Sequence, residues 1–390
     1  MAEIDKGGET GNLQPRLVAW ETTRACNLAC VHCRAEAQYR PDPNQLTTAE
    51  GFRLLEEIAS FAKPILILTG GEPLLRPDIY DLAAHGTELG LRMVMSPCGT
   101  SLTPEVVRKL IDVGIVRLSI SLDGSSAEVH DNFRQTPGAF EGTIRGMRYC
   151  HEAGLSFQVN TTVTKRNVHD LPAILETVVS VGAAAWHPFM LVPTGRGKAI
   201  HSEEVTPEQY ESTLQWVEQV SRTQPILVKP TCAPHYVRIL RQAAVRDRRE
   251  GNEGTKPQGH PAAGHPHGGH PDGKASQMPG YGLHSISRGC MAGDGFCFVS
   301  HLGEVHGCGF LPILAGNVRE KPFPEIYQHS QVFQMLRDYD KLEGKCGRCE
   351  YRVKCGGCRA RAYAESENYL AEEPYCVYEP KPSPEMARKP

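Results

Sequence analysis

The sequence of 390 residues has little that would tie it to a membrane or to nucleic acid. No apolar run approaches the roughly 20 residues that a membrane-spanning helix needs, and the first residues lack the apolar core of a secretion signal. Lysine and arginine together number 42 against 45 aspartates and glutamates, so no excess of positive charge favours a nucleic-acid partner. We therefore expect a cytoplasmic protein with no membrane or nucleic-acid partner.

Cysteine, in contrast, is abundant, with 14 residues that stand mostly in short-spaced groups. In the reducing cytoplasm such groups serve as metal ligands rather than as disulfides. Cys26, Cys30 and Cys33 are separated by three and then by two residues. Three thiolates leave one iron of a four-iron cluster without a protein ligand, and that iron could hold a substrate or cofactor. A structural zinc loop is the alternative reading of the same residues.

The first two hundred residues alternate between apolar runs and amphipathic stretches, which predicts strands that are each followed by a helix. The predicted strands span residues 16–21, 64–69, 92–96, 116–123, 156–163 and 185–192. Thr47 with Glu50 predicts a capping box, and Thr103 before Pro104 predicts another helix start. The fold class is therefore α/β, with a parallel sheet curled into a partial (β/α)6 barrel and the function at the carboxyl ends of the strands.

Four parts are expected along the chain: a disordered leader at 1–15, the barrel at 16–225, a bridging helix with a linker at 226–287, and a cysteine-rich domain at 288–390. The linker contains the run GHPAAGHPHGGHPDG, which has too little apolar surface to pack. We favour a disordered insert. The alternative is a site for a metal or a haem iron at His260, His265, His267 and His270.

Polar motifs follow several of the predicted strands. Strand two ends in a turn whose glycines permit close backbone approaches and whose acid could hold an amino group, namely Gly70, Gly71, Glu72 and Pro73. Ser121 ends strand four, Asn160 stands on strand five, and Arg134 can pair with a carboxylate. Each motif alone could be an ordinary turn or a polar residue inside the barrel. Their gathering at one end of the sheet predicts a binding site.

Eight cysteines in the last part are enough for two fully ligated four-iron clusters: Cys290, Cys297, Cys308, Cys346, Cys349, Cys355, Cys358 and Cys376. A zinc ribbon is the alternative for the four residues from Cys346 to Cys358. Cys150 is expected to be an inert core thiol, and Cys98 the same, although it follows strand three and so lies near the strand ends.

These motifs resemble the radical S-adenosylmethionine (SAM) superfamily, through CxxxCxxC at Cys26 to Cys33, GGEP at 70–73 and the motifs of strands four and five. The resemblance spans about residues 16–200. It implies that the open iron chelates SAM and that an electron from the cluster yields a 5′-deoxyadenosyl radical. It further implies that Glu72 and nearby backbone hold the methionyl amino group, Arg134 the methionyl carboxylate, and Ser121 with Asn160 the ribose.

The C-terminal block resembles the SPASM extension, which carries two auxiliary clusters, and Gly303 stands five positions before Cys308 as in that motif. The resemblance assigns one cluster to Cys290, Cys297, Cys308 and Cys358, and the other to Cys346, Cys349, Cys355 and Cys376. Two residues separate Cys355 from Cys358, where the family more usually has three.

Longer segments, among them LVAWETTRACNLACVHCRAEA, KPTCAPHY and KCGGCRARAYAESENYLAEEPYC, are similar to the SAM-dependent haem synthases of the siroheme-based pathway. That family implies a radical SAM enzyme that oxidatively decarboxylates two propionates of Fe-coproporphyrin III to the vinyl groups of haem b. The implied cofactors are SAM and [4Fe-4S] clusters, one binding SAM and two auxiliary. The implied partners are the iron tetrapyrrole and an electron donor such as ferredoxin or flavodoxin.

A substrate with four carboxylates calls for cationic side chains, and the candidates by position are Arg196, Lys198, Lys229 and Arg238. Each of these is equally explained as a solvated surface residue. Candidate contacts to the porphyrin or its iron are His187, Cys232, His235 and Tyr236. For the two histidines, a structural role beside a proline is the alternative.

Three other functions stay open. A sister enzyme of the same pathway would remove acetate groups from 12,18-didecarboxysiroheme to give Fe-coproporphyrin III. A SPASM enzyme that modifies peptides should need a peptide-docking domain ahead of the barrel, whereas about fifteen polar residues precede the first predicted strand. A non-enzymatic electron-transfer protein would have no use for a SAM site.

Overall fold

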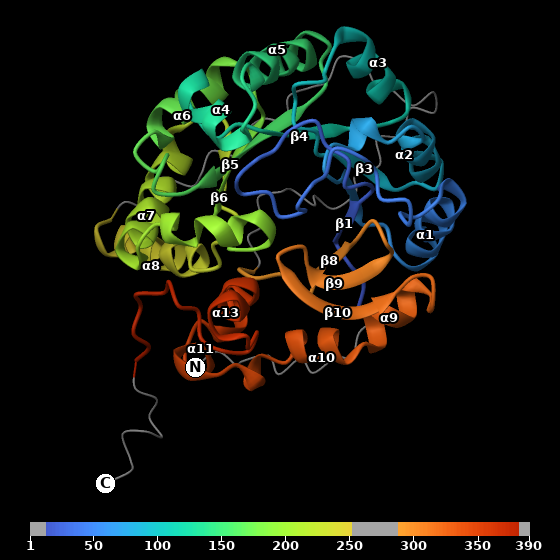
Figure 1. Ribbon diagram of the computed structural model, residues 1–390. Helices are drawn as coiled ribbons and strands as arrows, with labels where there is room; N and C mark the ends of the chain where they lie inside the picture. The colour runs from blue at the N-terminus through green and yellow to red at the C-terminus, as the bar shows by residue number, and fades with distance from the viewer. Residues whose placement is uncertain (1–12, 252–287, 382–390) are drawn as a thin grey trace.

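The computed structural model describes residues 13–251 and 288–381 (Figure 1). Residues 1–12, 252–287 and 382–390 lie outside the described residues, and with them most of the predicted leader and the four histidines of the predicted linker. Among the residues that the structure describes, no helix has both the length and the apolar character to cross a membrane.

One curved sheet of ten strands organises the described chain, in the order β10-β9-β8-β1-β2-β3-β4-β5-β6-β7. The strands are β1 (Leu17–Glu21), β2 (Ile65–Thr69), β3 (Arg92–Met95), β4 (Arg117–Ser121), β5 (Phe157–Val163), β6 (Ala185–Met190), β7 (Leu227–Val228), β8 (Phe296–Val299), β9 (Glu304–Cys308) and β10 (Leu311–Asn317). Neighbours from β1 to β7 pair in parallel, which confirms the predicted barrel strands to within two residues at either end.

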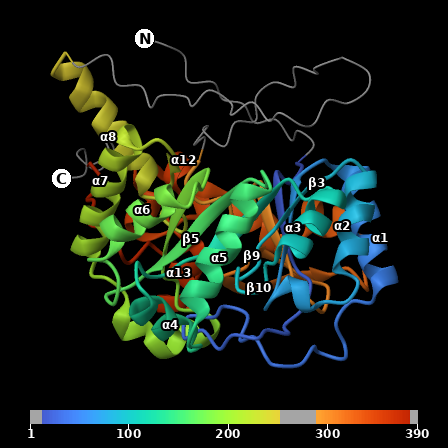
Figure 2. The same cartoon turned by 90° about the horizontal axis from the view of Figure 1, so that it is seen from above.

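Helices cover the convex face of the parallel strands (Figures 1 and 2). They are α1 (Thr48–Phe61), α2 (Ile79–Glu88), α3 (Pro104–Asp112), α4 (Ala127–Arg134), α5 (Ala139–Glu152), α6 (Leu171–Ser180), α7 (Pro207–Thr223) and α8 (Tyr236–Arg249). The predicted capping box is confirmed, because the Thr47 side chain accepts from the Glu50 N–H and the Glu50 carboxylate accepts from the Thr47 N–H. Thr103 caps α3, with Pro104 in its first turn.

The main core lies between this sheet and the helices that cover it. Trp20 of β1 is fully buried, and it packs so tightly against α1 that a side chain on Gly51 would come within 2.7 Å of the ring. Leu68 of β2 and Leu82 of α2 are fully buried beside it. Truncating one such leucine to alanine removes about 2–5 kcal/mol of stability, so this core fixes the strand ends on which the site is built.

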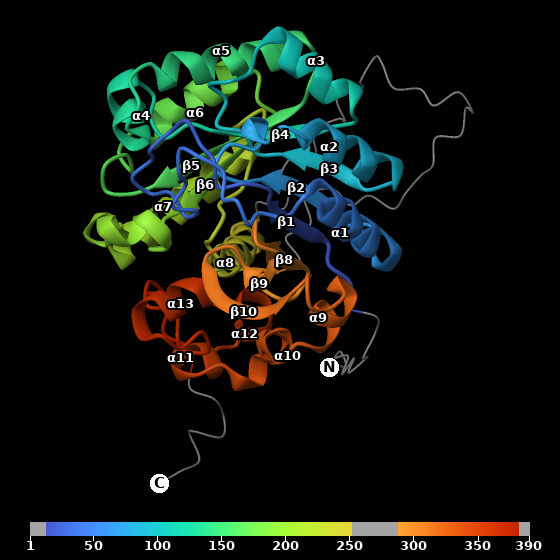
Figure 3. The same ribbon diagram turned by 45° about the vertical axis from the view of Figure 1, so that its right-hand side comes forward.

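The cysteine-rich part joins the same sheet (Figure 3). Strand β8 pairs in parallel with β1, and β9 and β10 follow it in antiparallel order. Short helices follow: α9 (Phe323–His329), α10 (Gln331–Arg337), α11 (Gly344–Gly347), α12 (Arg352–Cys355) and α13 (Arg359–Ser366). Of these, α9, α10 and α13 pack against β10, whereas α12 packs against α8. The barrel and the cysteine-rich part are therefore continuous through hydrogen bonds of the sheet.

Candidate active site

The loop of Cys26, Cys30 and Cys33 follows β1 and is tied to the end of β2. The N–H of Gly71 donates to the Thr23 carbonyl and the N–H of Glu72 to the Ala25 carbonyl, each at 2.7 Å. A side chain on Gly71 would lie 2.3 Å from the Ala25 carbonyl oxygen, and one on Gly70 would lie 2.5 Å from that of Thr23. Both glycines are thus required for the close approach that positions the cysteine loop.

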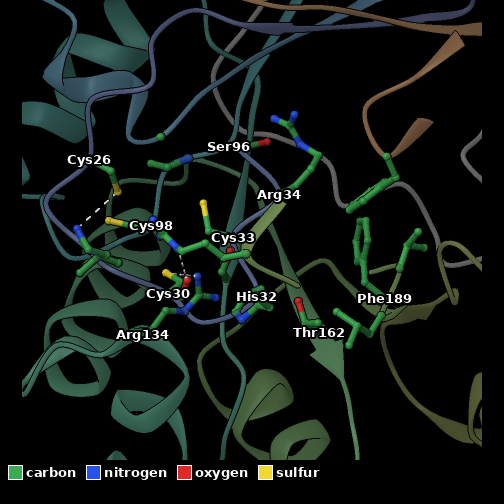
Figure 4. Close-up of a pocket in the computed structure, with 18 of the residues that line it drawn as sticks. Cys26, Cys30, His32, Cys33, Arg34, Ser96, Cys98, Arg134, Thr162 and Phe189 are labelled. Atoms are coloured by element: carbon green, nitrogen blue, oxygen red, sulfur yellow. Dashed lines mark hydrogen bonds between the residues drawn. The ribbon is translucent and has the colours of Figure 1, made fainter. Parts of the chain in front are cut away.

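A pocket opens where this loop meets the carboxyl ends of the strands (Figure 4). The residues that line it come from the loop, from the ends of β3 to β6 and from the β9–β10 turn: Cys26, Leu28, Cys30, His32, Cys33, Arg34, Gly71, Ser96, Pro97, Cys98, Ser121, Arg134, Thr162, Phe189, Met190, Leu191, Val192, Arg196 and Phe310. One wall carries the three cysteines and polar side chains, whereas Phe189, Leu191 and Phe310 make another wall apolar. Such a mixed wall suits a ligand with both charged and flat apolar parts.

Arg134 places a fixed positive charge beside the cysteine loop. Its Nη2 lies 2.6 Å from Asp123 Oδ2, and its Nη1 donates to Cys30 Sγ at 3.5 Å. Burial alone would lower the pKa of Arg134, but Asp123 and Cys30 hold that pKa above its ordinary value. The guanidinium therefore stays charged beside the sulfur of Cys30.

His32 and Cys26 show how strongly burial acts in this pocket. Burial lowers the pKa of His32 to about 4 and raises the pKa of Cys26 to about 12. His32 is therefore neutral near pH 7. The Cys26 thiol becomes a thiolate only when a metal replaces its proton, which suits a ligand rather than a free nucleophile.

Glu72 and Asn160 do not line this pocket, in contrast to the roles that the sequence resemblance implied. Glu72 is fully buried, and its two carboxylate oxygens accept from the N–H groups of Cys98, at 2.6 Å, and Leu74, at 3.1 Å. The carboxylate thus joins the loop after β3 to the short helix η1 (Pro73–Leu75). Asn160 accepts from Gln158 Nε2 at 3.2 Å. Gly71, Ser121 and Arg134 do line the pocket, and Thr162 joins them from β5.

The first C-terminal cysteine set differs from the expected one in a single member. Cys232, Cys308 and Cys358 pack in one cluster of side chains. Burial raises the pKa of the Cys232 thiol well above its ordinary value, and the nearby Cys358, Cys308 and Cys290 raise it further. Cys297 instead lies on β8, fully buried within the main core. The geometry brings together Cys232, Cys290, Cys308 and Cys358, hereafter set one.

Cys232 could not be placed in set one from spacing, because it stands on the far side of the linker from Cys290. The structure distinguishes Cys232 by its backbone, because its φ is +55°, a conformation that non-glycine residues rarely adopt. It sits in the proline-flanked segment between α7 and α8. Strained backbone of this kind is typical of functional positions.

The second C-terminal set agrees with the expected partition. Its four members line one small pocket together with His235 and Glu373: Cys346, Cys349, Cys355 and Cys376, hereafter set two. Cys346 Sγ accepts from the Glu373 N–H at 3.3 Å and from Arg359 Nη2 at 3.8 Å. Two donors therefore point at the sulfur of Cys346.

Among the four predicted substrate contacts, none lines the pocket at the strand ends. His187 lies inside the barrel on β6, where burial lowers its pKa to about 3. Tyr236 packs in the core and its hydroxyl donates to Ser221 Oγ. Cys232 belongs to set one, and His235 lies against set two.

Of the predicted cationic candidates, only Arg196 lines the pocket. Its Nε donates to the Cys30 carbonyl at 2.9 Å and its Nη1 to the Ala37 carbonyl at 2.8 Å, while its buried Nη2 has no partner among the described residues. Lys198 is exposed, Lys229 is half-buried away from the pocket lining, and Arg238 pairs with Glu211.

Sequence reasoning missed Arg34, which lies in the pocket directly after Cys33. Its guanidinium stacks 4.4 Å from the Phe298 ring centroid, and its Nη2 donates to Glu21 Oε2 at 2.7 Å. Glu21 in turn lies 2.9 Å from His301 Nδ1. Charged side chains thus connect the cysteine loop to the β8–β9 hairpin. No local sequence motif predicts this contact, because the two segments are far apart in the chain.

Comparisons with known proteins agree with this architecture. Residues 20–178 match the model of the Radical SAM superfamily, and residues 290–350 match that of SPASM, an iron-sulfur cluster-binding domain. SuiB of Streptococcus suis bound to S-adenosylmethionine superposes with a TM-score of 0.68 at 14% identity, over 94% of this chain and 78% of that one. anSMEcpe with bound AdoMet and a peptide gives a TM-score of 0.62 at 15% identity, over 91% and 93%. These two likenesses show the shared fold.

Closer relatives are found by sequence. An AdoMet-dependent heme synthase of Methanosarcina barkeri is 48% identical over 94% of this chain and 97% of the relative, and one of Oleidesulfovibrio alaskensis is 44% identical over 98% and 92%. An Fe-coproporphyrin III synthase of Methanosarcina barkeri is 31% identical over 92% and 87%. SAM and iron-sulfur clusters are the cofactors of this architecture. By identity over nearly its whole length, the chain belongs to the family of the AdoMet-dependent heme synthases, within the radical SAM superfamily.

Proposed function

We propose that this protein is a radical SAM enzyme that converts Fe-coproporphyrin III to haem b. Each of two propionates, –CH2–CH2–CO2⁻, loses one hydrogen atom, one electron and CO2 and becomes –CH=CH2. The observation that carries the proposal is the three-cysteine pocket at the strand ends, in a chain 48% identical to a heme synthase along nearly its full length. When bound there, SAM and the iron-sulfur cluster supply the radical that removes the hydrogen atom.

The cysteine loop fits such a cluster. Cys26, Cys30 and Cys33 lie together against one pocket and offer three ligands, which leaves one iron for the methionyl group of SAM. Arg134 stands beside Cys30 as a permanent cation suited to the methionyl carboxylate. The hydroxyls of Ser121 and Thr162, rather than Asn160, are placed to hold the ribose.

The opposite wall suits the tetrapyrrole. Phe189, Leu191 and Phe310 present apolar surface to a flat macrocycle. Arg196 lines the same pocket, and its attachment to the Cys30 and Ala37 carbonyls would hold a propionate carboxylate near the cysteine loop. A second cation, Arg34, lines the same pocket.

The electron that leaves with CO2 needs an acceptor, and we assign this task to the C-terminal cysteine sets. Phe310 in the pocket wall is two residues from Cys308, and its N–H donates to Cys308 Sγ at 3.5 Å. Set one therefore approaches the pocket, with set two beyond it. We infer a small electron carrier such as ferredoxin or flavodoxin as the donor to the SAM cluster, with the protein acting in the cytoplasm.

The deciding experiment is an anaerobic assay of the reconstituted protein with SAM, a reductant and Fe-coproporphyrin III. We expect LC–MS to show haem b together with the intermediate that has lost one CO2. The second candidate is removal of acetate groups from 12,18-didecarboxysiroheme, because a relative named Fe-coproporphyrin III synthase is 31% identical. A parallel assay with that compound separates the two. Its conversion, with Fe-coproporphyrin III left untouched, would refute the proposal.

A further inference from the structure

A fully buried ion pair lies between the two C-terminal cysteine sets. Arg361 of α13 and Glu373 are both 0% exposed, and Arg361 Nη1 lies 3.4 Å from Glu373 Oε1. Burying two charges is costly, so such a pair is weak evidence for stability and invites a functional explanation.

Arg361 connects set one to the wall of the active-site pocket. Its Nη2 donates to the Leu191 carbonyl at 2.9 Å, and its Nη1 donates to the Cys232 carbonyl at 3.3 Å. The ring centroids of Tyr210 and Tyr375 lie 5.1 and 5.4 Å from the guanidinium carbon. These contacts hold a permanent positive charge in a water-poor site directly behind Cys232.

Glu373 connects set one to set two. Its Oε2 accepts from the N–H of Cys358, a member of set one, at 2.6 Å. Its own N–H donates to Sγ of Cys346, a member of set two. His235 Nε2 lies 3.6 Å from the same Oε2. A single residue thus touches both sets, and its Oε2 accepts from a backbone N–H of set one.

One further carboxyl faces this pair. Glu204 Oε1 lies 3.6 Å from Arg361 Nε, and burial raises the pKa of Glu204 to about 7. Near neutral pH Glu204 is thus partly protonated, so it offsets Arg361 less than a fully ionised carboxylate would. Arg361 and Glu373 are therefore fully buried permanent charges that contact set one directly.

A buried charge acts strongly on a nearby redox centre, because the low local dielectric screens it little. Adding an electron makes an iron-sulfur cluster more negative, so a neighbouring cation raises its reduction potential and a neighbouring anion lowers it. We propose that Arg361 raises, and Glu373 lowers, the reduction potential of the cluster held by set one, so that this pair sets how readily it takes up an electron. The inference rests on the function and the ligands proposed above.

Arg361 and Glu373 contact set one at different residues. Arg361 donates to the Cys232 carbonyl, and Glu373 accepts from the Cys358 N–H. Neither lines the active-site pocket, so both act through the cluster.

Redox titration of the reconstituted holoenzyme, followed by electron paramagnetic resonance, tests the proposal. In R361Q we expect the equilibrium constant for reducing this cluster to fall about tenfold or more, which is 59 mV for a one-electron couple. In E373Q we expect an increase of about tenfold or more. The double variant R361Q/E373Q should return close to the wild-type potential.

Opposite signs distinguish a charge effect from a structural one. If both residues only held the fold, each variant would lose iron, or both potentials would shift in the same direction; either result overturns the proposal. E365Q is the matched control, because Glu365 lies on the same helix and pairs with His201 rather than with either set. Its potential should equal that of the wild type.

If R361Q fails to fold, E373Q decides alone. A raised potential at wild-type iron content supports the proposal, and an unchanged potential refutes it. R361K keeps the charge and should rescue the potential. The titration needs no tetrapyrrole, so a result that overturns this proposal would leave the haem synthase assay unaffected. The iron content of C232S tests the ligands of set one separately.

Discussion

The N-terminal cysteine loop and the C-terminal cysteine sets use the same thiolate chemistry to different ends. Cys26, Cys30 and Cys33 face a pocket built from the strand ends, and three ligands leave an iron open to that pocket. Sets one and two each gather four cysteines, which closes the coordination of a four-iron cluster. In the function proposed above, the number of ligands separates the cluster that binds SAM from the two clusters that carry electrons.

Both regions nevertheless aim an arginine at a cysteine sulfur. Arg134 Nη1 lies 3.5 Å from Cys30 Sγ in the loop, and Arg359 Nη2 lies 3.8 Å from Cys346 Sγ in set two. Arg134 also lines the pocket, whereas Arg359 donates hydrogen bonds to the Tyr369 and Ala371 carbonyls. The two regions thus share an arginine beside a cysteine sulfur, and only the arginine of the N-terminal loop also lines the pocket.

Removing the three cysteines of the N-terminal loop should have the largest effect. We expect the variant C26A/C30A/C33A to lose SAM cleavage entirely, because no other three-cysteine pocket lies among the strand ends that the structure describes. It should keep about eight of about twelve irons. The readout is 5′-deoxyadenosine by LC–MS together with iron analysis. C150A is the control, since Cys150 is buried on α5 away from every set. Continued formation of 5′-deoxyadenosine would mean that the radical arises elsewhere.

Breaking set two should separate radical formation from product formation. In C346S/C349S we expect SAM cleavage to persist while haem b formation falls more than about tenfold, because the electron released with CO2 has no acceptor. Both products are quantified by LC–MS in one anaerobic assay. Retained SAM affinity must be shown, to exclude damage to the barrel. A normal yield of haem b would leave set two with a structural function only.

A matched pair of substitutions tests the membership of set one. We expect C232S to lose about four of about twelve irons and C297S to lose none, because only Cys232 lies among the other three thiols of set one. Iron content and the low-temperature resonance spectrum give the answer. The reverse result, with iron lost from C297S alone, would restore the assignment that the resemblance implied.

The smallest expected effect is on the pH dependence of stability, through the contact of Glu204 with Arg361. Glu204, beside Arg361, has a pKa raised by burial to about 7 from an ordinary 4.5. Below pH 4.5 the Glu204 carboxyl is protonated in both the folded and the unfolded chain. As the pH rises toward 7, only the unfolded chain releases this proton. The free energy of unfolding therefore falls, by at most about 3 kcal/mol. We expect E204Q to lack this loss. Its unfolding temperature relative to wild type should therefore rise between pH 5 and pH 8, and a constant difference would contradict the assignment.

Sequence patterns predicted what is local in this molecule. The barrel strands follow from alternating apolar and amphipathic segments. The four cysteines that the resemblance assigned to set two line one pocket, although Cys358 of set one lies in the same range, 346–376. The strand pattern depends on neighbours in the chain. The three-cysteine loop was visible for the same reason.

What the sequence could not predict depends on contacts between distant segments. Cys232 reaches set one from the segment between α7 and α8, while Cys297, with a better spacing, is turned into the core by the pairing of β8 with β1. Glu72 carries the right charge for an amino group, yet its oxygens face backbone N–H groups. Side-chain direction at a strand end is set by the packing of neighbouring loops, which one motif does not encode.

The pairing of β1 with β8 has a consequence for biogenesis. Strand β1 leaves the ribosome long before β8, which lies far along the chain. Until β8 arrives, β1 is an edge strand with unpaired backbone groups, and Glu21 at its end lacks His301. The loop of Cys26, Cys30 and Cys33 is therefore fully anchored only after β8 has been synthesised. In the function proposed above, a nascent or truncated chain would thus lack a well-formed radical centre as long as it lacks the part that accepts the electron.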